Sequence, residues 1–236
     1  MTDADPLLVS VLIPVYNGER YLAETIESVL QQQWQPIEIV VVDDGSEDGS
    51  AEVATGFGDA VRCVRRPHRG LSAARNTALA AARGGFIAHL DADDLLPPGS
   101  IAVRMAAFTA DPALEIVVGH QREFFSPDLA EADRSRLALP ASAKPGHVAG
   151  TSIVRAECFR RLGGFDEQLR AFADLDWFIR VQETGARLRL LPDVVMHRRV
   201  HGRNMSLTLK EAAGDRMKVL KASLDRRRRA AEGGAA

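Results

Sequence analysis

Four short apolar runs, separated by segments that favour helix, fill the first 95 residues and constrain the fold more than any other feature. The runs are residues 8–13, 37–43, 61–65 and 86–90. Two of them, "LVSVLI" and "IEIVVVD", are rich in β-branched residues, as is typical of strands covered by helices on both faces. Strands and helices in alternation predict an α/β fold with a mostly parallel, doubly wound sheet.

The second half of the chain is less regular. We expect a helix over 100–111, a strand over 114–125, a loop over 126–146 and a charged helix from about residue 207. Glycines are expected to end two further helices, and Pro192 to break the last strand.

The composition is that of an ordinary globular protein. The net charge of −2 implies no general attraction to nucleic acid. The N-terminus does not resemble a signal peptide, and no run approaches the roughly 20 apolar residues of a membrane span. Cys63 and Cys158 form no CxxC pair, so we expect a reduced, cytoplasmic setting. We interpret the arginine run 226–229 as a solvated end, with peripheral contact to acidic lipid or a partner as the alternative.

Polar residues follow the strands of the predicted sheet, where ligands of such sheets bind. The most charged segment is "HLDADD", which brings Asp91, Asp93 and Asp94 together at the end of an apolar strand. Two carboxylates 4 Å apart repel by about 1 kcal/mol in water and about 4 kcal/mol at an effective dielectric constant of 20. Either a positive group meets these acids or water reaches them freely. Asp94 is expected to lead the helix that follows.

Five segments together resemble the successive motifs of family 2 glycosyltransferases with the GT-A fold. They are "VSVLIPVYNGERYL", "VVVDDGSEDGS", "GLSAARNTAL", "HLDADD" and "GGFDEQL…ADLDWFIRV". Each motif alone is weak, but their order and spacing together are specific. Enzymes of this family transfer a sugar from a nucleotide diphosphate to an acceptor, usually with inversion at the anomeric carbon.

The resemblance implies a domain organisation. A single GT-A domain is expected over residues 8–206, with a nucleotide-sugar-binding half (8–98) and an acceptor-binding half (99–206). A disordered N-terminus (1–7) would precede it, and a C-terminal helix and tail (207–236) would follow.

The resemblance also implies a site for the donor sugar nucleotide, with a UDP-sugar as the default. Tyr16 would stack on the base and Asp44 would accept the uracil N–H, although an Asp pair here is also typical of a turn. Asp91 would contact the ribose or a metal-bound water. The full set of expected nucleotide-sugar-binding residues is Pro14, Tyr16, Asp43, Asp44, Arg69, Gly70, Arg75, Asp91 and Ala92.

A divalent cation would reconcile the acids with a negatively charged diphosphate. Oxygen ligands suit Mn²⁺ or Mg²⁺. The family pattern implies Asp93 and Asp91 at the metal, with His201 of "MHRRVHGRNMS" as a third ligand. The alternative is a solvated acidic loop without metal.

Inverting transfer needs one carboxylate beside the acceptor hydroxyl. The family usually supplies it from a Glu-Asp pair that opens a helix, but the pair here is Ala173-Asp174. Asp174 is therefore the expected base and Asp176 the fallback, while a helix cap is the structural alternative for both.

Two other functions stay open at this point. A sugar nucleotidyltransferase also uses a doubly wound sheet and Mg²⁺, but "PVYNGERYL" lacks the Gly- and Arg/Lys-rich loop expected after its first strand. A non-catalytic nucleotide-sugar-binding protein is favoured only by Ala173. The acceptor is expected to be an unidentified hydroxyl compound.

Overall fold

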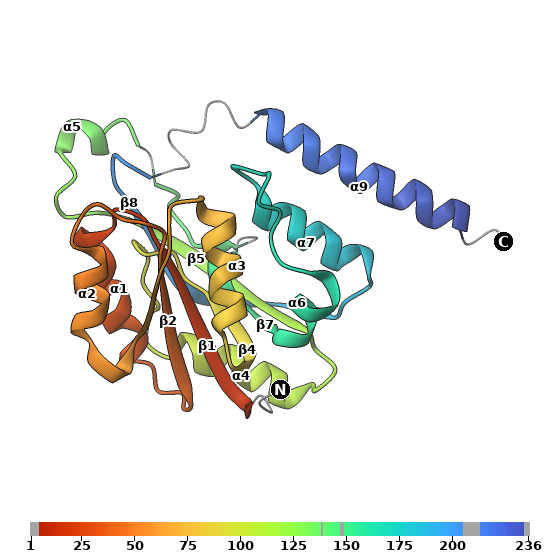
Figure 1. Ribbon diagram of the computed structural model, residues 1–236, viewed down its shortest axis with the longest axis horizontal. Helices are drawn as coiled ribbons and strands as arrows, with labels where there is room; N and C mark the ends of the chain where they lie inside the picture. The colour runs from red at the N-terminus through yellow and green to blue at the C-terminus, as the bar shows by residue number, and fades with distance from the viewer. Residues whose placement is uncertain (1–4, 138, 147–148, 205–212, 234–236) are drawn as a thin grey trace.

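The computed structural model describes residues 5–137, 139–146, 149–204 and 213–233. Its centre is an eight-stranded sheet with the order β3-β2-β1-β4-β7-β5-β6, in which β8 pairs with β5 (Figure 1). The strands are β1 (Asp5–Val15), β2 (Ile37–Asp43), β3 (Arg62–Arg65), β4 (Gly84–His89), β5 (Ile116–Phe125), β6 (Lys144–Pro145), β7 (Ser152–Arg155) and β8 (Leu188–Val200).

Most of the sheet is parallel, as the sequence predicts. Parallel ladders join β3 to β2, β2 to β1, β1 to β4, and β5 to β8. The exceptions are β7, which is antiparallel to β4 and β5, and the short β6, which is antiparallel to β5. The predicted α/β class with a mostly parallel, doubly wound sheet is therefore confirmed.

Helices cover both faces of the sheet and bury two separate apolar clusters. Val11 and Ile13 of β1 belong to one cluster with side chains of α1, α2 and α4, whereas Leu12 belongs to the other with side chains of α3, α6 and α7. This alternation follows from the two-residue period of a strand. The helices are α1 (Glu19–Leu30), α2 (Ser50–Gly56), α3 (Leu71–Ala81), α4 (Ser100–Ala110), α5 (Glu131–Arg134), α6 (Ala156–Leu162), α7 (Ala173–Glu183) and α9 (Ala213–Gly233), with 3₁₀ turns η1 (Gly58–Ala60) and η2 (Ala149–Thr151).

Several element boundaries differ from the predictions. β1 begins at Asp5, so residues 5–7 are part of a strand and not of a disordered N-terminus; residues 1–4 lie outside the described residues. β8 continues through Pro192 and is not broken there. Its pairing with β5 shifts register at this point: Val118 pairs with Leu190 and His120 with Val194, so Pro192 lies in the irregular stretch between the two pairings. The expected loop 126–146 contains α5 and β6.

The C-terminal helix is confirmed as α9, which packs on the outside of α7 (Figure 1). Its expected start at residue 207 falls in 205–212, outside the described residues. Among the residues that the structure describes, no helix is long and apolar enough to cross a membrane.

Candidate active site

The motifs meet at the carboxyl edge of the parallel strands. Backbone hydrogen bonds hold the segments that follow β2 and β4 against β1. The N–H of Asp44, after β2, donates to the carbonyl of Val15 at 2.8 Å, and the N–H of Leu90, after β4, donates to the carbonyl of Leu12 at 3.0 Å. The segment after Leu90 is then held against β8, because Leu95 and His197 exchange backbone hydrogen bonds of 3.0 and 2.8 Å. Residues far apart in sequence therefore share one edge of the sheet.

Asp43 and Asp44 are both buried and are both engaged within the protein. Asp43 accepts the backbone N–H of Ser46 at 2.9 Å, which is the turn geometry that an Asp pair favours. Asp44 accepts the N–H groups of Arg69 at 3.2 Å and of Gly70 at 2.7 Å, and it also lies 3.2 Å from the guanidinium of Arg66. Asp44 therefore organises the loop that enters α3.

Tyr16 remains accessible at the end of β1, with 46% of its surface exposed. Its ring stacks on His68 with centroids 4.0 Å apart, and the Nδ1 atom of His68 lies 2.9 Å from the carboxylate of Asp44. Pro14 is buried inside β1, opposite Val42 of β2, so the strand ends after the proline and not at it. His68 was not predicted to lie here, because only the fold brings its loop over Tyr16.

The three acids of "HLDADD" take three different partners. Asp91 forms an ion pair of 2.8 Å with Arg75, a buried residue of α3. Asp93 lies 2.9 Å from the Nε2 atom of His201. Asp94 is buried and accepts the backbone N–H of Arg199 at 2.9 Å. Each of the three carboxylates therefore has its own partner within the protein. α4 begins only at Ser100, so Asp94 does not lead that helix.

The environment of Asp94 disfavours its negative charge. Burial, with the nearby charges of Asp93 and Asp91, raises the pKa of Asp94 well above its ordinary value, despite the hydrogen bond from Arg199. Asp91 and Asp93 are the more exposed acids of the segment. Between them, the carbonyl of Ala92 accepts the hydroxyl of Thr25 at 2.9 Å, which fixes the loop to α1.

Arg199 is a buried residue that hydrogen-bonds to the backbone of Asp93. Its side chain is only 2% exposed and donates to the Asp93 carbonyl at 2.9 Å and to Glu24 of α1 at 2.5 Å. The guanidinium also lies 4.8 Å from the ring centroids of both Tyr21 and Phe124. Neither Tyr21 nor Glu24 was predicted to lie at the site, because the pattern of a surface helix does not indicate which residues of other elements its side chains contact.

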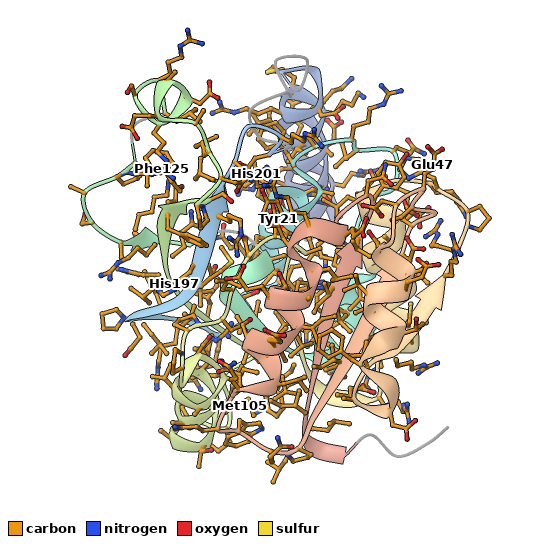
Figure 2. The ribbon with its side chains drawn as sticks, turned by 90° about the vertical axis from the view of Figure 1, so that its left-hand side faces the viewer. Tyr21, Glu47, Met105, Phe125, His197 and His201 are labelled. Carbon is orange, nitrogen blue, oxygen red and sulfur yellow. The ribbon has the colours of Figure 1, made fainter. Side chains whose placement is uncertain are left out.

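His201 is held next to Asp93 by its neighbours. Figure 2 shows His201 beside Tyr21, and their ring centroids are 4.9 Å apart. Asn204 accepts the backbone N–H of His201 at 2.6 Å and donates to Asp93 at 3.2 Å. Among the described residues, no three His, Cys, Asp or Glu side chains are grouped to hold a metal ion by themselves. Asp93 and His201 instead form a two-residue pair, with Asp91 turned toward Arg75.

Arg69 and Gly70 lie on the loop before α3. Gly70 has a φ of +93°, a conformation that favours glycine, and its N–H is used by Asp44. The side chain of Arg69 is 67% exposed and forms an ion pair of 3.0 Å with Glu167. Asn76 of α3 also binds Glu167, at 3.0 Å, so these contacts join α3 and the loop before it to the segment before α7.

Asp174 and Asp176 have different surroundings in the first turn of α7. Asp174 is partly exposed, and its carboxylate accepts the N–H of the adjacent Leu175 at 2.9 Å. Asp176 is buried, 2.9 Å from Arg180 and 3.6 Å from Arg226 of α9. Asp174 is thus the more exposed of the two acids, and Asp176 links α7 to α9.

Comparisons with known proteins identify relatives of this chain. The chain is 30% identical over 234 residues to a chondroitin synthase of Pasteurella multocida; the match covers 94% of this chain but 24% of that protein, so the chain spans about a quarter of its length. Two solved structures share the fold, the TarS protein of S. aureus in complex with UDP-GlcNAc and the mannosyltransferase PcManGT of Pyrobaculum calidifontis in complex with GDP-Man and Mn²⁺. TarS has a TM-score of 0.69 at 21% identity, covering 84% of this chain and 60% of that one; PcManGT has a TM-score of 0.65 at 26% identity, covering 85% and 59%.

These likenesses confirm the GT-A fold that the motifs indicated. A family model described as "Glycosyl transferase family 2" matches residues 10–162, which include the second, third and fourth motifs and all but the first residue of the first motif. The chain therefore belongs to glycosyl transferase family 2.

Proposed function

We propose that this chain is an inverting, metal-dependent glycosyltransferase that moves a sugar from a nucleoside diphosphate to an acceptor hydroxyl. The observation that carries the proposal is the pairing of Asp93 with His201 at the carboxyl edge of the sheet. Buried neighbours hold the pair in place: Arg199 donates to the Asp93 carbonyl, and Asn204 donates to the Asp93 carboxylate and accepts the backbone N–H of His201.

The donor set at this edge fits a divalent cation that arrives with its nucleotide. A carboxylate and a neutral imidazole supply two ligands, and Mg²⁺ and Mn²⁺ commonly complete their shells with water and substrate phosphates. Bound there, the cation would stabilise the charge that develops on the leaving diphosphate. The related PcManGT, with GDP-Man and Mn²⁺ in its structure, supports this assignment.

The nucleoside is proposed to lie beside Tyr16, whose exposed ring is already stacked against His68. Asp44 shapes this subsite through the loop before α3, since its carboxylate is occupied by the N–H groups of that loop. Asp91, held by Arg75, faces the ribose in this arrangement. We keep a UDP-sugar as the default donor and propose Arg69 as a phosphate-binding residue that leaves Glu167 when the donor binds.

Asp174 is proposed as the catalytic base. It would accept the proton of the acceptor hydroxyl as that oxygen attacks the anomeric carbon from the side opposite the diphosphate. Asp176 is poorly suited to this step, because two arginines neutralise it and it is buried. Ala173, which stands where the family has its Glu, is buried and faces the apolar cluster beneath α7.

A donor screen tests the proposal. The protein would be incubated with UDP-, GDP- and dTDP-sugars and Mn²⁺, and release of the nucleoside diphosphate would be measured with and without candidate acceptors. We expect slow donor hydrolysis without acceptor, and an NMR coupling constant of the product that reports inversion. Asp174→Asn should keep donor binding and lose transfer by a factor of about 10² or more. Asp59→Asn, on the exposed η1 turn, is the matched control.

Each alternative has its own outcome. Turnover of a nucleoside triphosphate with a sugar phosphate would identify a nucleotidyltransferase. Tight, metal-dependent nucleotide binding with no hydrolysis and no transfer would identify a non-catalytic binding protein. Near-normal transfer by Asp174→Asn would move the base to another residue while leaving the donor site intact.

A further inference from the structure

The outer face of α9 presents a row of apolar side chains to solvent. Met217 is 65% exposed, Leu220 is 44% exposed and Leu224 is 55% exposed. Their spacing of three and four residues places them on one face of the helix. Within the described ranges, no other helix exposes more than one large apolar side chain.

This row is not needed to attach the helix. The opposite face of α9 attaches the helix, because Val219 is buried in the apolar cluster that also contains side chains of α7. Arg226 and Ser223 each bind Glu183 at 2.6 Å, and Asp215 accepts the backbone N–H of Arg170 at 3.0 Å. The helix is therefore fixed to the protein along one side, and the apolar row remains on the other.

Basic side chains border the apolar row on both sides. At 100° per residue, Arg216 and Arg227 lie along one border and Lys221 and Arg228 along the other. Arg227 is partly neutralised by Glu183, at 3.7 Å. An apolar stripe between basic rows is the pattern of a helix that lies in the interface of an anionic bilayer, with its apolar side chains at the headgroup boundary.

We infer that α9 docks lengthwise on the surface of a bilayer that contains anionic lipids. Met217, Leu220 and Leu224 enter the headgroup boundary, and Lys221 and Arg228 contact lipid phosphates. A second copy of this chain fits the face less well, because pairing two such faces brings their basic rows together. This inference does not depend on the proposed function.

Vesicle co-sedimentation tests the inference directly. The full chain would be mixed with vesicles of phosphatidylcholine alone and with vesicles containing about 30% phosphatidylglycerol, at low and at physiological salt. We expect binding to the anionic vesicles that weakens as salt is raised. The triple variant Met217→Gln, Leu220→Gln, Leu224→Gln should lower the partition coefficient by about tenfold or more. The charge variant Lys221→Gln, Arg228→Gln should lose most of the component of vesicle binding that salt weakens.

The matched control changes three leucines of similar exposure elsewhere. Leu30, Leu188 and Leu190 are 46%, 41% and 45% exposed, and their triple replacement by Gln should leave vesicle binding unchanged. Circular dichroism would verify that both triple variants keep the fold. Three results would overturn the inference: no binding of the parent, equal binding to neutral vesicles, or undiminished binding by the α9 triple variant. If light scattering showed that the parent is a dimer and the α9 triple variant a monomer, the apolar row would be an interface with a second copy, and the inference would also be overturned.

Discussion

Replacement of Arg199 by methionine tests whether Asp93 is held by a buried cation. Methionine fills a similar volume but donates no hydrogen bond, so the variant loses the contacts to the Asp93 carbonyl and to Glu24 and the two ring contacts. Glu24 is 56% exposed and stays hydrated, so losing that ion pair costs little. The Asp93 carbonyl, however, loses its charged donor, at a cost of about 1–3 kcal/mol, and the two cation–π contacts are lost as well. We therefore expect a total loss of about 3 kcal/mol.

Urea unfolding followed by circular dichroism measures this change. With a slope near 3 kcal/mol/M, a loss of about 3 kcal/mol lowers the midpoint by about 1 M. Arg122→Met, an exposed arginine on β5, is the control and should change stability by less than about 0.5 kcal/mol. If Arg199→Met also stayed within about 0.5 kcal/mol of the parent, Arg199 would not be the support that we describe.

Three further outcomes follow from the same geometry. Asp176→Asn should destabilise the protein by about 1–3 kcal/mol in urea, because it removes the partner of Arg180; an unchanged midpoint would refute the structural role of Asp176. Partial burial alone would raise the pKa of Glu183, but hydrogen bonds from Arg226 and Ser223 hold that pKa below its usual range. The ionised Glu183 therefore stabilises the fold above its unfolded-state pKa of about 4.3, and this stabilisation is lost as the pH falls through the folded-state pKa. The melting temperatures of the parent and of Glu183→Gln should accordingly become equal in acid. A difference in melting temperature that did not change with pH would contradict this. His201→Gln should weaken Mn²⁺-dependent nucleotide binding by about tenfold or more in calorimetry, with little effect on metal-free binding, and equal affinity would remove His201 from the metal site.

Local sequence patterns predicted the sheet and the edge at which the site lies. The apolar runs identified β1, β2 and β4, and because parallel strands align their carboxyl ends, the polar residues that follow them were expected to meet. Gly163 and Gly185, which take φ values of +76° and +70°, end α6 and α7 as their residue type indicates.

Contacts between side chains that only the tertiary structure brings together were not predicted from the sequence. Asp44 was expected to face a nucleobase, yet its carboxylate binds the loop before α3. Arg199 lies in the segment "MHRRVHGRNMS", which does not indicate that the fold buries this arginine between Tyr21 and Phe124. These outcomes depend on which helix lies over which strand, and periodicity does not contain that information.

The central claim is that Asp93 and His201 jointly bind the cation that accompanies the donor nucleotide. A crystal of the protein grown with Mn²⁺ and UDP, with diffraction data collected at the manganese absorption edge, tests it most directly. We expect an anomalous peak within bonding distance of Asp93, His201 and the diphosphate oxygens, in place of the present direct contact between the two side chains. A nucleotide bound beside Tyr16 with manganese elsewhere, or with His201 still on Asp93 and no metal, would contradict it.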